Sequence, residues 1–193
     1  SKTSASKYGI STSSISSASD WQYSQIYSDP LAWLAAGTVD FISPQLYWIT
    51  THSTNAYGPL SKWWSDACSK VFQRHFYSSH SISFLYGANT TTNWAEVAKQ
   101  IQYNRDYDGL NAPGCVLFGS RDLSGVRTEG IAPYLKANKF QYKALPPTLT
   151  WKSSLASNPG KVTNLAITGT NLTWTGHNNM RYVVYAVPNG TSV

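Results

Sequence analysis

The stretch that decides the fold is residues 39–48, with the sequence VDFISPQLYW. A short apolar run that is rich in β-branched and aromatic residues is typical of a buried strand. A helical pattern precedes it, because Ser28 or Asp29 can cap a helix and Pro30 fits its first turn. Gly37 can end that helix. The stretch therefore predicts a β-strand that follows a helix directly in the chain.

The alternation of strands and helices continues to about residue 142. Strand-like runs occupy residues 8–12, 82–87 and 114–119. Helical patterns occupy residues 60–71 and 131–137, and a third helical segment begins with a capping box of Asn93 and Glu96. Strands that are separated by helices make right-handed crossovers and form a parallel sheet. Four such units are half of an eight-stranded barrel and cannot close it, so we expect a segment of a longer protein.

The pattern changes after residue 145. Pro146, Pro147 and the polar residues behind them predict a linker over residues 146–160. Three short strand patterns then follow without a helical pattern between them, at residues 161–168, 171–175 and 181–187. Residues 161–193 are therefore expected to begin an antiparallel β-sandwich, which needs about seven strands in all.

Composition narrows the classes of function. Of the 193 residues, 12% are charged and 14% are aromatic, which argues against a disordered chain. The net charge of +6 comes from basic residues that are scattered along the chain, so no nucleic-acid partner is expected. No apolar run is long enough to span a membrane. Cys68 and Cys115 could form a disulfide or remain two buried thiols.

No cofactor and no metal are expected. His75 and His80 lie five residues apart without Cys or acidic ligands near them in the sequence. The sequence also lacks a phosphate-binding loop, a dinucleotide fingerprint and a G-x-S-x-G nucleophile motif. Chemistry that depends on those groups is therefore not predicted.

Residues 40–48 resemble the D-[YF]-I-x-P-Q-x-Y-W strand of the glycosyl hydrolase-like family 10, a group of TIM-barrel enzymes of the bacterial cell envelope. Further segments resemble this family in the same order: Tyr8-Gly9-Ile10-Ser11, Trp63-Trp64, Leu85-Tyr86-Gly87, Gln100-x-x-Tyr103-Asn104-Arg105 and the run from Gly114 to Phe118. Residues 146–185 are similar to the fibronectin type III-like module that often follows this barrel. The resemblance implies an α/β fold: residues 1–145 form the C-terminal half of a (β/α)8 TIM barrel, and a partial all-β fibronectin III-like sandwich follows.

The resemblance also implies a function. It implies hydrolysis of O-glycosidic bonds in an envelope polysaccharide such as the glycan strands of peptidoglycan, at a secreted, periplasmic or cell-envelope location. Glycoside hydrolysis needs two carboxyl groups that flank the scissile bond. The nine acids show no evident pair, and the acidic signature of the family belongs to an earlier strand, so the principal catalytic acids are expected outside these residues. A non-catalytic glycan-binding protein or an envelope-attachment protein is the alternative.

Six polar or aromatic residues are predicted to bind substrate because they follow strands at the carboxyl end of the barrel: Gln45, Tyr47, Trp48, Tyr86, Asn89 and Asp122. Alternation points Gln45 and Tyr47 to the same face, with Trp48 at the rim. Amide and phenol groups can bond sugar hydroxyls, and an indole can stack on a pyranose. Tyr47 and Trp48 could instead complete the core, and Asp122 could instead form a turn near Gly125.

A half barrel also predicts a partner. The edge of an incomplete parallel sheet exposes unpaired backbone groups. We therefore expect the missing half of the barrel, or another copy of the chain, to cover that edge. The expected ligand is a polysaccharide or an oligosaccharide.

Overall fold

The computed structural model describes residues 2–82, 91–110, 113–124, 130–152, 161–177, 180, 182–184 and 186. The chain divides into two compact units, Ser1–Gln141 and Tyr142–Val193, which we describe one at a time. Within the described residues, no helix is both long and apolar enough to cross a bilayer.

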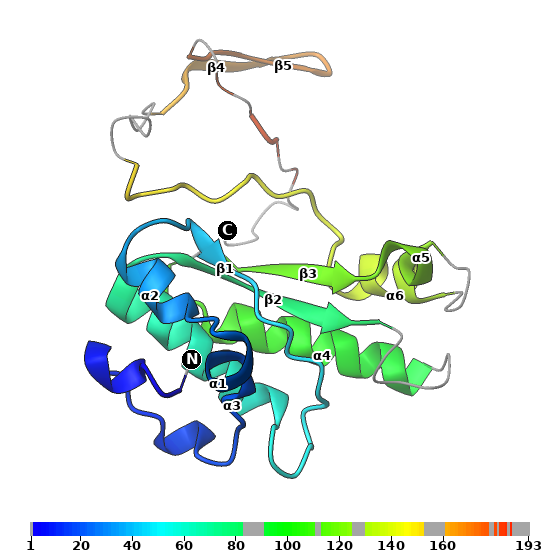
Figure 1. The fold of residues 1–193 in the computed structure, drawn as a ribbon. Helices are drawn as coiled ribbons and strands as arrows, with labels where there is room; N and C mark the ends of the chain where they lie inside the picture. Colours follow the sequence, from blue (N-terminus) through cyan, green and yellow to red (C-terminus); the bar gives the residue numbers. More distant parts are fainter. Residues whose placement is uncertain are drawn as a thin grey trace. The chain divides into compact units, whose positions relative to one another are not determined.

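The first unit is built on a parallel sheet. Its described strands lie in the order β1 (Phe41–Ile42), β2 (His75–Ser81) and β3 (Gly114–Phe118), as Figure 1 shows. The chain of β1 continues alongside β2, because Gln45 forms a further parallel bridge with Ser79. The strand predicted within residues 39–48 is therefore present, with its regular hydrogen bonding interrupted between Ile42 and Gln45. A mixed α/β unit with a parallel sheet is compatible with part of a TIM barrel.

Helices cover one side of this sheet. Helix α3 (Tyr57–Asp66), which continues as a π-helical turn at Ala67–Phe72, packs against α4 (Thr91–Tyr107) and β2 (Figure 1). Helix α6 (Ile131–Asn138) packs against α4 in turn. The helices predicted at residues 60–71 and 131–137 are thus confirmed.

Two apolar clusters fill the space between the sheet and the helices. The larger one includes Leu31, Leu34, Ile42, Leu46, Tyr57, Trp63, Trp64, Cys68 and Phe76, and the smaller one includes Ile82, Val97, Ile101, Ile131 and Leu135. Apolar side chains on the opposite face of the sheet remain accessible: Phe41, Val116 and Phe118 are 47%, 43% and 57% exposed. The outer strands β1 and β3 therefore expose one face, whereas β2 is buried on both faces, with His75, Ser79 and Ser81 at 0–5% exposure.

Three short helices complete the unit: α1 (Trp21–Ile26), α2 (Pro30–Ala35) and α5 (Ser120–Leu123). Helix α2 begins as predicted, because the Asp29 carboxylate accepts a hydrogen bond from the amide of Ala32 and Pro30 occupies the first turn. Gly37 follows the helix with φ of +66°, a left-handed conformation that favours glycine.

The strand predicted at residues 8–12 is absent. A 3₁₀ helix at Ala5–Tyr8 precedes Gly9, which turns the chain with φ of +68°. The carbonyl of Ser11 accepts a hydrogen bond from the Trp63 indole at 2.8 Å and lies outside the described sheet. Local hydrogen bonds and the left-handed turn at Gly9 therefore replace sheet pairing in this segment.

Two further predictions need correction. A strand precedes the run predicted at residues 82–87, since β2 ends at Ser81, and residues 83–87 lie outside the described residues. Helix α4 begins at Thr91, so Asn93 is not its cap. The carboxylate of Glu96 instead accepts hydrogen bonds from the amide and hydroxyl of Thr50, at 2.7 and 3.0 Å, because the loop after β1 packs against α4.

The second unit contains an antiparallel hairpin of β4 (Thr163–Thr168) and β5 (Asn171–Thr175). Gly169 turns this hairpin with φ of +62°. The strand predicted at residues 181–187 is not seen at residues 182–184 and 186, and the rest of that range lies outside the described residues. The fibronectin-like sandwich and the linker boundaries remain predictions.

Candidate functional site

The chain that follows β1 carries three of the predicted residues. It runs beside β2, because the amide of Ser79 donates to the carbonyl of Pro44 at 3.0 Å and the Leu46 amide donates to the Ser79 carbonyl at 3.3 Å. Leu46 is buried in the larger apolar cluster, whereas Gln45 is exposed and Tyr47 is half-buried. Gln45 and Tyr47 therefore alternate with a core residue, as the period of an extended chain requires.

Tyr47 forms an aromatic contact with Phe118 at the end of β3. The two ring centroids are 6.0 Å apart and the planes are 27° from parallel, so the rings stack. The hydroxyl of Tyr47 also lies 3.2 Å from the hydroxyl of Ser79 on β2. The carboxyl ends of all three strands are thus joined by one polar and one aromatic contact of the same side chain.

Gln45 and Trp48 line a small cavity of about 100 Å³ at the same end of the sheet. Core residues such as Leu46, Trp63 and Trp64 form part of its wall. The other polar residues that line it come from distant parts of the chain: Lys2, Ser19, Asp20, Gln22 and Asn55. The Trp48 ring is half-buried and meets the His52 ring edge to face at 6.4 Å. An indole with amides and a carboxylate around it has the chemistry of a sugar subsite, in which apolar faces stack and hydroxyls are hydrogen-bonded.

Asp20 is a cavity residue that the sequence did not single out. Its carboxylate accepts hydrogen bonds from the amides of Lys2 and Thr3, at 3.0 and 2.6 Å. Burial alone would raise the pKa of Asp20, but these hydrogen bonds outweigh it and lower the pKa below its usual value. Asp20 is therefore ionised at neutral pH and suits accepting bonds from sugar hydroxyls rather than donating a proton. Only the fold brings it to Gln45, since the two residues are far apart in the sequence.

The remaining predicted residues divide into two groups. Asp122 lies in α5, directly after β3, and is 6% exposed. Its amide donates to the carbonyl of Gly119 at 3.1 Å, so the main chain turns there as a helix begins. Tyr86 and Asn89 lie outside the described residues. The structure therefore brings together Gln45 and Trp48, places Tyr47 beside them through Ser79, and leaves Asp122 buried behind β3.

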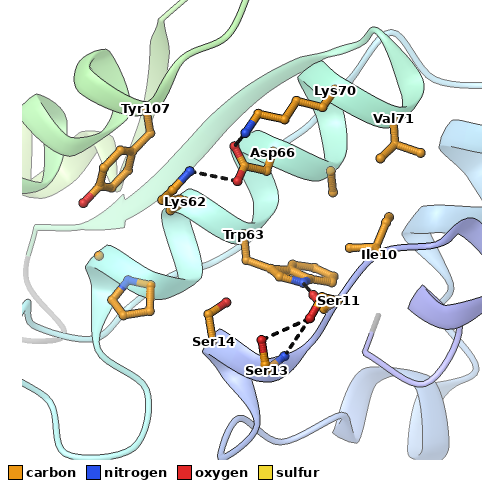
Figure 2. A pocket seen from close by; sticks show the side chains of 13 residues that line it. Ile10, Ser11, Ser13, Ser14, Lys62, Trp63, Asp66, Lys70, Val71 and Tyr107 are labelled. Carbon is orange, nitrogen blue, oxygen red and sulfur yellow. Dashed lines mark hydrogen bonds and ion pairs between the residues drawn. The ribbon is translucent and has the colours of Figure 1, made fainter.

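A larger pocket of about 520 Å³ lies on the outer side of α3, between residues 10–14 and Tyr107 (Figure 2). Gln45, Tyr47, Trp48 and Asp122, the predicted residues that the structure describes, do not line it. The Asp66 carboxylate in this pocket is held by Lys62 at 2.8 Å and by Lys70 at 3.0 Å. Burial alone would raise the pKa of Asp66, but the two lysines outweigh it and lower the pKa. Among the described residues, Asp66 is the one acid that lines this pocket, so they supply no second carboxylate there for paired-carboxylate chemistry.

The two cysteines are buried or partly buried. Cys68 and Cys115 are both free thiols, and burial raises the pKa of Cys68 to about 12 and that of Cys115 to about 11. A thiol in such surroundings stays protonated and is a poor nucleophile. Within the part of the chain that the structure describes, no three His, Cys, Asp or Glu side chains group as metal ligands.

Comparisons with known proteins find similarity to glycosyl hydrolases. The family model described as Glycosyl hydrolase-like 10 matches residues 3–95. The glycosyl hydrolase YngK of Bacillus subtilis is 28% identical over 146 residues, which are 74% of this chain and 28% of that protein. The glycosyl hydrolase DigH of Escherichia coli K12 is 26% identical over 121 residues, which are 60% of this chain and 27% of that protein. The chain thus spans less than a third of the length of these relatives.

Proposed function

Because residues 3–95 belong to the glycosyl hydrolase-like 10 family, we propose that this chain is part of a glycoside hydrolase and supplies a glycan-binding portion of its site. The observation that carries this proposal is the cavity at the carboxyl end of β1, lined by Gln45, Trp48 and Asp20. Ligands of parallel α/β folds bind at the carboxyl ends of the strands. The position of the cavity and its side chains support the proposal, and at about 100 Å³ it would take one part of a sugar ring.

Each group of this cavity has a definite task in the proposal. Trp48 offers its indole face to the apolar side of a pyranose ring. The stacked pair of Tyr47 and Phe118, which does not line the cavity, offers a second aromatic surface. The amides of Gln45 and Asn55 can both donate to and accept from sugar hydroxyls. Asp20 can only accept when ionised, so it selects a hydroxyl donor at its position.

The acids of the described residues support a catalytic pair located elsewhere. Asp29 caps α2, Asp66 is held by two lysines, and Glu96 binds the loop at Thr50. Glycoside hydrolysis needs one carboxyl group that gives up a proton and a second that acts as nucleophile or base. We therefore propose that the principal catalytic acids lie outside these residues, while this chain binds and orients the glycan.

The proposed substrate is the glycan strand of peptidoglycan, at a secreted, periplasmic or cell-envelope location. Strands that have lost their peptides carry free lactyl carboxylates, which makes them polyanions. The chain has a net charge of +6, and such a charge favours approach to a polyanion over long distances. Binding should therefore weaken as salt screens that attraction.

Binding can be tested on the chain itself. We expect it to sediment with insoluble glycan strands stripped of peptides, and less with cellulose, chitin or starch. Trp48→Ala should lower the retained fraction about tenfold, because stacking on one aromatic ring contributes about 1–2 kcal/mol. Trp33→Ala is the matched control, since Trp33 is 44% exposed on α2 and does not line the cavity. Equal retention of Trp48→Ala and the unchanged chain would overturn the assigned site.

Hydrolysis is tested with the whole protein that carries this chain. Release of reducing ends from the same stripped strands is the expected result. If no reducing ends appear from these strands or from common plant and host polysaccharides, the hydrolase proposal is wrong.

The second candidate is a non-catalytic glycan-binding protein. The observation that favours it is the structural engagement of Asp29, Asp66 and Glu96, which leaves few described acids for chemistry. Retention on glycan strands without any release of reducing ends would select this candidate over the enzyme.

A further inference from the structure

A buried network of polar side chains joins β2 to the two main helices. His80 of β2 and Gln100 and Asn104 of α4 are each 0–3% exposed. His80 Nδ1 lies 3.0 Å from Gln100 Oε1, and His80 Nε2 lies 3.1 Å from Asn104 Nδ2. The Oδ1 atom of Asn104 accepts from the hydroxyls of Tyr57 at 2.6 Å and Ser61 at 2.8 Å on α3. Polar groups at this depth are held where they are because each needs its partner.

These contacts fix the direction of every hydrogen bond in the network. Asn104 Oδ1 accepts, so its Nδ2 donates to His80 Nε2, which must then be the unprotonated nitrogen. His80 Nδ1 therefore carries the proton and donates to Gln100 Oε1. Burial lowers the pKa of His80 to about 4, although the bond to Gln100 opposes this, so the ring is neutral at pH 7. With Oε1 used in this way, the Nε2 group of Gln100 is directed away from His80.

That Nε2 group reaches the loop that carries Trp48. It donates to the carbonyl of Trp48 at 3.1 Å and to Glu96 Oε1 at 3.1 Å. Glu96 in turn binds the amide of Thr50 at 2.7 Å and its hydroxyl at 3.0 Å. The main chain is therefore held on both sides of residue 49, at the carbonyl of Trp48 and at the amide of Thr50.

We propose that Gln100 is a positioning residue that, oriented by His80, sets the place of the Trp48 indole in the cavity. The inference rests on the proposed function, because Trp48 is the assigned glycan contact. Gln100 cannot touch the glycan, since it is fully buried between α4 and β2. It holds the main-chain carbonyl of Trp48, and a shift of that main chain would displace the stacking ring. Affinity for glycan should therefore depend on a residue outside the cavity.

The test compares Gln100→Met with Gln102→Met in the full chain labelled with 5-fluorotryptophan. Methionine keeps the length of glutamine and removes its hydrogen bonds, and Gln102 lies on the same helix with bonds to Asp106 and Lys139 instead. The ¹⁹F resonance of Trp48 is assigned by its loss in Trp48→Phe. Gln100→Met removes the bonds to His80, the Trp48 carbonyl and Glu96, so we expect it to shift and broaden this resonance. Retention on stripped glycan strands should weaken about tenfold, because a displaced indole loses its stacking on the sugar. Gln102→Met should change neither.

Each outcome decides one of the two claims. An unchanged Trp48 resonance in folded Gln100→Met overturns the positioning role. If Gln100→Met does not fold, Gln100→Asn replaces it, because asparagine keeps a polar amide but is one methylene too short to reach both His80 and the Trp48 carbonyl, and an unchanged resonance there overturns the role as well. If the resonance shifts in Gln100→Met while Gln100→Met and Trp48→Ala both keep wild-type retention, the positioning role stands and the assigned glycan contact is refuted. A ¹⁵N spectrum of His80 that shows an Nε2–H tautomer would contradict the direction of the network.

Discussion

The two faces of the three described strands differ in what their side chains meet. On the helix side, His80 of β2 contacts Gln100 and Asn104 of α4, and apolar clusters lie on both sides of that contact. On the opposite face, Phe41, Val116 and Phe118 are 47%, 43% and 57% exposed. The helix side therefore fixes the fold and the position of the loop after β1. The face with Phe41, Val116 and Phe118, called the open face below, carries side chains that can be replaced with little effect on stability. Mutations on the helix side should therefore lower the free energy of unfolding more than mutations on the open face.

Asn104→Leu should have the largest effect. Leucine has a similar size, but it leaves the hydroxyls of Tyr57 and Ser61 without their acceptor and His80 Nε2 without its donor. Three buried groups without partners should lower the free energy of unfolding by about 4 kcal/mol. Urea unfolding followed by circular dichroism measures this change. A loss below about 1 kcal/mol would show that the network contributes little and that the helix side is held by apolar contacts alone.

The second-largest effect is expected from acid, which should destabilise the helix side of the sheet. His80 has a pKa of about 4 in the folded state and an ordinary value of 6.5, so the unfolded chain binds the proton more tightly. The contribution of His80 to the free energy of unfolding is therefore complete above pH 6.5. It is lost as the pH falls toward 4, by about 3 kcal/mol at most. The groups that face the ring are neutral: Gln100, Asn104 and Tyr57, whose pKa is raised by burial.

Urea unfolding at several pH values measures the slope. His80→Gln is the control, because glutamine keeps a donor and an acceptor but cannot titrate. The variant should lose most of the slope between pH 6.5 and 4. An equal slope in both proteins would show that His80 is not the source of the acid sensitivity in this range, since Asp20, whose lowered pKa acts in the same direction, contributes only at lower pH.

Phe118→Ala tests the aromatic pair at the strand ends. The ring of Phe118 is 57% exposed and stacks on Tyr47, so its removal should cost about 1 kcal/mol of stability. Retention on stripped glycan strands should fall further than this loss explains, because the second aromatic surface is gone. Sedimentation with the strands, at a temperature where both proteins are folded, separates binding from stability. Wild-type retention would remove the pair from the proposed site.

The difference between the faces also explains what the sequence could predict. Helix α2 could be predicted because Asp29, Pro30 and Gly37 act locally, through a cap, a fixed φ and a left-handed turn. Helix α3 could be predicted because its apolar residues recur at helical spacing. Strand β2 could not, since its sequence HFYSSHS lacks an apolar run. Its burial depends on partners such as Gln100, which is twenty residues from His80 in the sequence.

The candidate site divides in the same way. Gln45, Tyr47 and Trp48 could be selected because they follow one recognisable strand, and alternation along an extended chain orients the first two. Asp20, Gln22 and Asn55 could not be selected, because their own segments give no strand or motif signal and only the tertiary fold brings them to the cavity. The clamp at Gln100 is hidden for the same reason. Its partners are a main-chain carbonyl at Trp48 and a ring nitrogen of His80, and neither leaves a pattern in the sequence.

Val116→Thr should have the smallest effect and tests whether the open face is open in solution. Threonine keeps the shape and the β-branch of valine, and at 43% exposure its hydroxyl can reach water, so the free energy of unfolding should fall by about 0.5 kcal/mol. Urea unfolding at two protein concentrations measures the change. Leu117→Thr is the matched variant on the helix side, where Leu117 packs against the smaller apolar cluster and where the loss should be about 2 kcal/mol. If Val116→Thr costs as much as Leu117→Thr, or if its cost rises with protein concentration, the open face is covered in solution by another copy of the chain.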